Sequence, residues 1–158
     1  MLLFSATGLK GGDLGRYKTE MLINAAYDYG TQLNLNKFRG IIDIRVPRKR
    51  GYIDRCIGGY CSADRYELND GKRHWWVTIE LANLTDKDML RNLAHEMVHA
   101  KQFLRKELTE TMDKWKGIVF TASNEDNYYL ESPWEREAYG MESILYTTYM
   151  EKKNGRRL

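Results

Sequence analysis

The chain has 158 residues, of which 42% are apolar and 30% charged, and 25 basic against 22 acidic side chains give a formal net charge of +3. A chain of this length can bury roughly 68–70% of the surface that its unfolded form exposes, so it can build a core without disulfides or a second domain. Two prolines and 13 glycines, among apolar residues spread over the whole length, exclude collagen-like repeats and long disordered linkers. We expect residues 1–158 to form one domain that ends in a basic, frayed tail from about residue 152.

The N-terminal segment MLLFSATGLKGG lacks the basic start and the long apolar core of a signal peptide. No stretch approaches the roughly 20 apolar residues that cross a bilayer. Cys56 and Cys61 are five residues apart, which is neither a disulfide framework nor a CxxC pair. These features predict a soluble, cytoplasmic protein with no membrane partner.

Two predicted elements occupy the first third of the chain. Residues 16–33 predict an amphipathic helix, because apolar side chains recur there at spacings of three and four residues. These positions are Leu22, Ala25, Ala26, Tyr29 and Leu33. Residues 40–47, GIIDIRVP, form a β-branched run that ends in proline, and this pattern predicts a short strand.

The segment from residue 37 to residue 55 carries the strongest charge bias, with seven basic against two acidic side chains. A run of this kind is typical of a solvated loop, and it is also a pattern that binds phosphate backbones. If it binds nucleic acid, Arg48, Lys49 and Arg50 are the candidate contacts.

Residues 56–81 predict a β-hairpin. The turn signal is Asn-Asp-Gly-Lys at 69–72, since Asp-Gly tolerates the positive φ of tight hairpin turns. Apolar residues then occupy every second position, at Trp75, Val77, Ile79 and Leu81. A period of two predicts a strand with one buried face.

Two further helices are predicted in the second half. Thr85 is a suitable N-cap for a helix that keeps apolar spacing to about residue 106. After an irregular stretch from 107 to 131, Ser132 and Pro133 supply an N-cap and a first helical residue for a helix that runs to about Lys153. The order helix, strands, helix, helix predicts an α+β domain in which a small, mostly antiparallel sheet packs on the central helix.

The central helix contains His95-Glu96-Met97-Val98-His99, an HExxH pattern. Histidines four residues apart share one helical face, so both imidazoles can reach one Zn²⁺ at about 2.0–2.1 Å. Zinc lowers the pKa of a bound water to about 7, and Glu96 can accept the proton of that water as it attacks a carbonyl. The pattern therefore predicts a catalytic zinc site with Glu96 as its base, and the alternative is a pair of histidines on a helix surface.

A catalytic zinc site needs a third protein ligand. Gln102 and Arg105 stand where metzincins have glycine and histidine, and no histidine follows His99. The third ligand is therefore a downstream acid or His74. As a residue that alternates with Trp75, His74 is more simply explained by the solvent face of a strand.

The downstream acids are Glu135 and Glu137, at the start of the last helix. They lie about 90° and 70° to either side of that helix's apolar stripe, so periodicity does not choose between them. The alternative for both is a solvated acid that stabilises the helix N-terminus. The stripe consists of Trp134, Ala138, Met141 and Leu145.

Three segments together resemble the zincin-like metallopeptidases, close to small SprT-like and bacteriophage-encoded members. They are HEMVHAKQF, Trp-Lys-Gly at 115–117 and SPWEREAY, and the resemblance covers residues 74–150. It implies a zincin-like fold, zinc-dependent peptide hydrolysis and, for a phage protein, the host cytoplasm. The first glutamate of the E-x-x-A motif is the third ligand in gluzincin-type relatives, which favours Glu135.

The resemblance also implies how a substrate binds. Relatives hold a peptide as an extra strand along the sheet edge beside the active-site helix, and the 56–81 hairpin would supply that edge. Tyr128, Tyr129 and Tyr139 are candidates to donate a hydrogen bond to an oxyanion. Tyr139 stands where many relatives have an aspartate, and the downstream histidine of SprT-like proteins is absent.

Two other functions are compatible with the sequence. One is a nucleic-acid-associated SprT-like protein that acts on DNA-bound proteins, and the other is a catalytically inactive protein with structural zinc. Two histidines and one carboxylate also suit other divalent ions.

Overall fold

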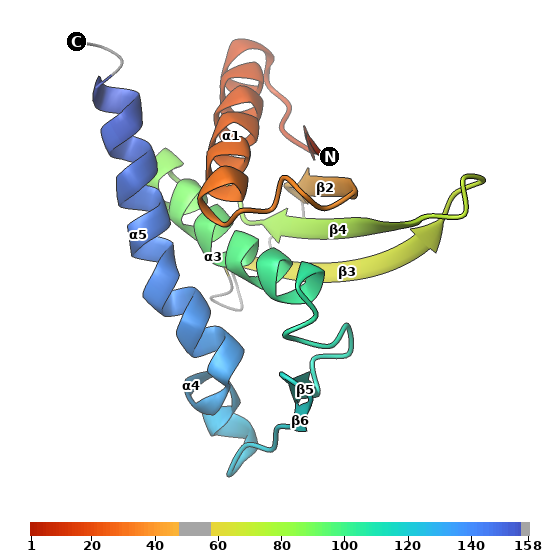
Figure 1. Cartoon of the computed structure of the whole chain (residues 1–158). Coiled ribbons are helices and arrows are strands. Elements are labelled where there is room, and N and C mark those ends of the chain that lie inside the picture. Colours follow the sequence, from red (N-terminus) through yellow and green to blue (C-terminus); the bar gives the residue numbers. More distant parts are fainter. Residues whose placement is uncertain (48–57, 156–158) are drawn as a thin grey trace.

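A computed structural model describes residues 1–47 and 58–155 (Figure 1). The chain is a mixed α+β protein, as predicted. Its elements in chain order are β1 (Leu2–Thr7), α1 (Gly12–Gln32), β2 (Gly40–Arg45), β3 (Gly59–Glu67), β4 (Arg73–Leu81), α3 (Asp86–Leu104), β5 (Lys114–Trp115), β6 (Ile118–Val119), a 3-10 turn (Glu125–Asn127), α4 (Tyr128–Glu131) and α5 (Pro133–Gly155).

The main sheet has the strand order β1-β2-β4-β3. β1 pairs in parallel with β2, β2 pairs in parallel with β4, and only β3 and β4 are antiparallel. The prediction of a mostly antiparallel sheet was therefore wrong. The sequence pattern did not predict β1, and α1 returns the chain to the end where β1 began, so β2 runs parallel to β1. β2 then pairs with β4 and not with β3, the strand that follows it in the chain, so this second pairing is parallel as well.

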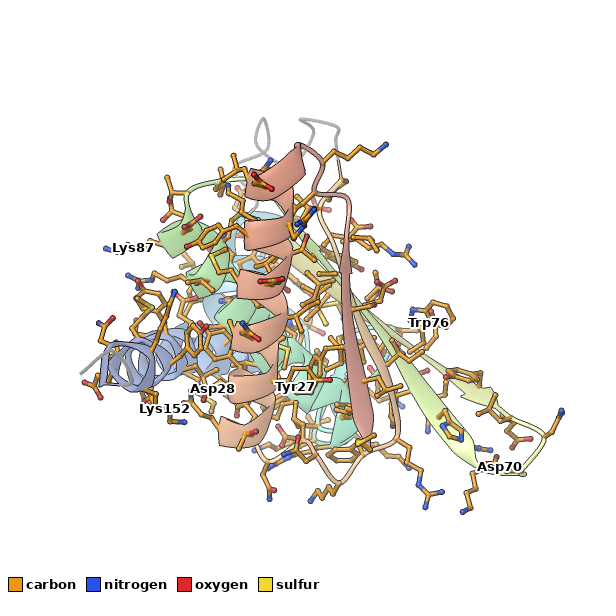
Figure 2. The ribbon with its side chains drawn as sticks, turned by 90° about the horizontal axis from the view of Figure 1, so that it is seen from above. Tyr27, Asp28, Asp70, Trp76, Lys87 and Lys152 are labelled. Atoms are coloured by element: carbon orange, nitrogen blue, oxygen red, sulfur yellow. The ribbon has the colours of Figure 1, made fainter. Side chains whose placement is uncertain are left out.

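The predicted hairpin is confirmed by β3 and β4, which pair continuously from Gly59 opposite Leu81 to Glu67 opposite Arg73. The four alternating apolar side chains of β4 are buried, whereas Trp76 is 42% exposed. In Figure 2 the helices lie on one side of the sheet and Trp76 points away from them. One face of β4 therefore packs on the core, and Trp76 lies on the opposite face. β3 and β1 are the two edge strands of the sheet.

The helices begin close to their predicted starts. Thr85 Oγ1 accepts a hydrogen bond from Asp88 N at 3.3 Å, which is the N-cap expected for α3. Pro133 opens α5, whereas the Ser132 hydroxyl donates to the carbonyl of Tyr129 at 3.5 Å. α1 begins four residues earlier than the predicted residue 16.

α5 lies beside both α1 and α3 (Figure 1). Lys152 Nζ donates to Asp28 Oδ1 at 2.9 Å, and Figure 2 shows these side chains facing one another. The helix continues to Gly155, so the first four residues of the expected frayed tail are helical. None of the helices in the described ranges has both the length and the apolar character of a membrane span.

Candidate metal centre

α3 and α5 bring two histidines and one glutamate together. His95 Nε2 lies 3.2 Å from His99 Nε2 and 3.1 Å from Glu135 Oε2, and His99 Nε2 lies 3.2 Å from Glu135 Oε1. In residues 1–47 and 58–155 this is the one group of three or more His, Cys, Asp or Glu side chains arranged to hold a metal ion. The structure thus places Glu135 at the pair of histidines, a choice that helical periodicity left open.

The separations of these donor atoms fit a small divalent ion. Tetrahedral ligands at about 2.0–2.1 Å from Zn²⁺ lie about 3.3 Å from one another. The two Nε2 atoms are 3.2 Å apart, and each lies 3.1–3.2 Å from a different oxygen of the Glu135 carboxylate. Two imidazole nitrogens and one carboxylate oxygen also form the ligand set of catalytic zinc sites, with a position left for water or substrate.

The two histidines and Glu135 shift one another's pKa values. Burial disfavours the charged form of His95, but the hydrogen bond to Glu135 and the charge of Glu96 outweigh it and raise the pKa of His95 to about 9. Burial also works against ionisation of Glu135, yet hydrogen bonds from His95 and His99 hold its pKa at about 2. Protons and a metal ion therefore compete for the same positions.

Glu96 lies in the same cavity and is 5% exposed. Burial raises the pKa of its carboxyl to about 7, against the opposing charges of His99 and His95. Gly59 of β3 packs directly on this side chain, because a Cβ at that position would lie 3.0 Å from Glu96 Cγ. A carboxyl with a pKa near neutrality can both accept and donate a proton.

Each histidine is held by a partner behind it that sequence reasoning missed. His95 Nδ1 lies 2.8 Å from Glu142 Oε2, and His99 Nδ1 lies 2.8 Å from Gln102 Oε1. Such contacts leave both Nε2 atoms for the metal position. Helical spacing carried a signal for both, since Glu142 is seven residues after Glu135 and Gln102 is three after His99.

The centre lies in a cleft of about 880 Å³ between β3, α3 and α5. Tyr128, Tyr129 and Tyr139, the predicted oxyanion donors, all line this cleft. The ring of Tyr139 is 4.7 Å from the ring of His95, centroid to centroid. The other lining residues in the described ranges are Gly58, Gly59, Tyr60, Cys61, Asn92, His95, Glu96, His99, Met112, Glu135 and Glu142.

The structure does not bring the two alternative ligands to the centre. Glu137 Oε1 accepts a hydrogen bond from Lys101 Nζ at 2.6 Å. His74 Nε2 lies 3.4 Å from Asp70 Oδ2, and Figure 2 shows Asp70 at the far tip of the hairpin. The solvent-face interpretation of His74 is consistent with this position.

The proposed nucleic-acid contacts Arg48, Lys49 and Arg50 lie outside the described residues. Of the same basic segment, Arg45 Nε pairs with Asp43 Oδ2 at 2.9 Å. Comparisons of the chain with protein-family models, with curated proteins and with solved structures found no match.

Proposed function

We propose that the chain is a zinc-dependent metallopeptidase of the zincin type, in which His95, His99 and Glu135 hold the ion and Glu96 is the general base. The observation that carries this proposal is the position of Glu96. It is a buried carboxyl in the same cleft as three converging ligand atoms. A structural metal site has no need of a proton acceptor beside it.

A bound divalent ion would polarise the scissile carbonyl and lower the pKa of the attacking water. Glu96, a buried carboxyl in the same cleft, accepts the proton of that water and passes it to the leaving amine. Tyr139 is the best candidate for a donor to the oxyanion, because its ring lies against His95 at the centre. Tyr128 is less suitable, since its hydroxyl lies 3.4 Å from the carbonyl of Met112.

The edge strand β3 supports binding of the substrate as an added strand. At the ends of the hairpin, Ala82 N donates to Gly58 O and Leu68 N donates to Lys72 O. By this register, the backbone N–H and C=O groups of the even-numbered residues of β3 form the hydrogen bonds with β4. In an antiparallel pair, hydrogen-bonded and non-hydrogen-bonded residues alternate, and the backbone groups of the non-hydrogen-bonded residues point away from the partner strand. The N–H and C=O groups of Gly59, Cys61 and Ala63 therefore face the open edge, where a peptide can pair with them.

Glu96→Gln tests the mechanism. The amide keeps the size of the side chain but cannot accept a proton, so hydrolysis of an internally quenched peptide library should fall at least about 100-fold while zinc content is unchanged. Glu151→Gln, an exposed change on α5, is the matched control and should leave both values unaltered.

Full residual hydrolysis by the Glu96→Gln variant would overturn the mechanism. One zinc per chain without cleavage of any library member by the unaltered protein would instead support a structural zinc protein.

A further inference from the structure

One buried amide connects the two helices that carry the metal ligands. Gln102 of α3 is fully buried, and its Oε1 lies 2.8 Å from His99 Nδ1. Its Nε2 donates to the Trp134 carbonyl at 3.0 Å and to Glu137 Oε1 at 3.2 Å. Trp134 and Glu137 flank Glu135, so Gln102 contacts one ligand and the residues on either side of another.

The partners of Gln102 determine which way its amide points. A carbonyl and a carboxylate accept hydrogen bonds, so both require the NH₂ group of the amide. Oε1 must then face His99, and it can only accept a hydrogen from Nδ1. The His99 Nδ1 therefore carries a proton, and Nε2 is the nitrogen left to bind a metal ion.

Lys101 extends this chain of contacts. Its Nζ donates to Glu137 Oε1 at 2.6 Å and to Glu107 Oε2 at 3.0 Å, and the whole residue is 8% exposed. An ammonium can only donate hydrogen bonds, so Glu137 Oε1 must be the acceptor in its contact with Lys101. The same oxygen then also accepts from the NH₂ group of Gln102. Because Lys101 is buried and Glu137 is partly buried, this pair is screened less than a fully exposed salt bridge.

We propose that Gln102, Glu137 and Lys101 are positioning residues that preform the metal centre. They fix the orientation of His99 and hold the first turn of α5 so that Glu135 reaches the two histidines. This inference rests on the metal site of the proposed function, but it does not depend on hydrolysis of a peptide.

The test is the zinc affinity of the full chain, measured by competition with a chromophoric chelator. Gln102→Leu keeps the approximate volume and removes all three contacts, so the Kd for zinc should rise by about 10–100-fold, as it does when the partner of a ligand is lost. Arg105→Met is the matched control. It removes the hydrogen bond from Arg105 to the carbonyl of Leu33, which joins the end of α3 to α1 away from the centre, and should leave the zinc Kd unchanged.

Lys101 provides a second pair of variants should Gln102→Leu fold poorly. Lys101→Met removes the donor and should weaken zinc binding about tenfold, whereas Lys101→Arg keeps a buried cation and should restore most of the affinity. In the zinc-loaded chain, NMR should show a slowly exchanging Nδ1–H signal for His99 that is lost in Gln102→Leu.

A zinc Kd within about threefold of the unaltered chain in both Gln102→Leu and Lys101→Met would overturn the inference, and so would an equal loss of affinity in Arg105→Met. Failure of the proposed function gives a different result. In that case the unaltered chain cleaves no peptide, while Gln102→Leu and Lys101→Met still bind zinc more weakly than the unaltered chain. A chain that binds no zinc would overturn both.

Discussion

The two sides of the metal centre use different chemistry to hold equivalent ligands. On the cleft side, His95 is held by the carboxylate of Glu142, which also lies 3.9 Å from Arg91, and it contacts the ring of Tyr139. On the core side, His99 is held by the neutral amide of Gln102, which solvent does not reach. Two histidines one helical turn apart therefore have one charged and one uncharged partner.

This difference follows from burial. The Glu142 carboxylate behind His95 keeps about a fifth of its side-chain surface exposed to solvent. A carboxylate in the fully buried position of the Gln102 side chain would be costly to desolvate, whereas the amide is satisfied by a carbonyl and by Glu137. If the proposed function holds, the cleft side would supply charge near the reacting atoms, and the core side would supply orientation.

The largest expected effect comes from removing a ligand on either side. His95→Ala, His99→Ala and Glu135→Ala should each weaken zinc binding by more than about 100-fold, the upper limit for loss of a supporting partner. Elemental analysis of the purified variants, beside the exposed control Glu151→Ala, measures this directly. Retention of zinc by Glu135→Ala would contradict its assignment as the third ligand.

Metal removal should affect the whole fold, because an ion held by His95, His99 and Glu135 would connect α3 to α5. At a free zinc concentration 100 times the Kd, binding adds about 2.7 kcal/mol to the free energy of unfolding. Thermal melts with and without EDTA should therefore differ for the unaltered chain and coincide for Glu135→Ala. Equal sensitivity to EDTA in both proteins would place the stabilising ion elsewhere.

Glu142 and Gln102 can be compared directly. Glu142→Ala should raise the zinc Kd about 10–100-fold, as expected for Gln102→Leu. Glu142→Gln keeps an acceptor for His95 but removes the charge, so it should bind zinc less tightly than the unaltered chain and more tightly than Glu142→Ala. If Glu142→Gln bound zinc as tightly as the unaltered chain, both histidines would need only orientation, and the contrast between the two sides would be lost.

The features that could be predicted from sequence are those that a few neighbouring residues determine. The HExxH spacing, the Thr85 cap, the Asp-Gly turn and the alternation along β4 are all of this kind. The pairing of β1 with β2 is not, because it joins residues 38 apart through the packing of α1. The strand order and the parallel pairings of the sheet could therefore not be predicted from the sequence and are known only from the structure.

The choice of the third candidate ligand also depended on a contact between residues far apart in the sequence. Glu135 and Glu137 lie at similar angles to either side of the apolar stripe, so helical periodicity gives no reason to prefer one. What separates them is Lys101, which lies 36 residues before Glu137 and whose Nζ donates a hydrogen bond to the Glu137 carboxylate at 2.6 Å. The resemblance to zincins favoured the same residue as the geometry, by an independent argument.

The smallest expected effect concerns the hydroxyl of Tyr139 on the cleft side. Loss of a well-ordered oxyanion donor costs about 100-fold or more in kcat. Tyr139 is 60% exposed and its ring is held mainly by His95, so Tyr139→Phe should lower kcat only about tenfold. The zinc Kd should not change, since the ring contact with His95 is kept.

Tyr129→Phe is the matched control for this measurement, because Tyr129 is similarly exposed in the same cleft but its ring packs on Tyr128. Equal loss of kcat in the two variants would contradict a specific role for the Tyr139 hydroxyl, and a rise in KM alone would assign the tyrosines to substrate binding along the cleft. A loss confined to Tyr139→Phe would place the oxyanion on the His95 side, where Glu142 and Tyr139 gather beside the more exposed ligand. The buried side of the centre would then act only by holding His99 and Glu135 in place.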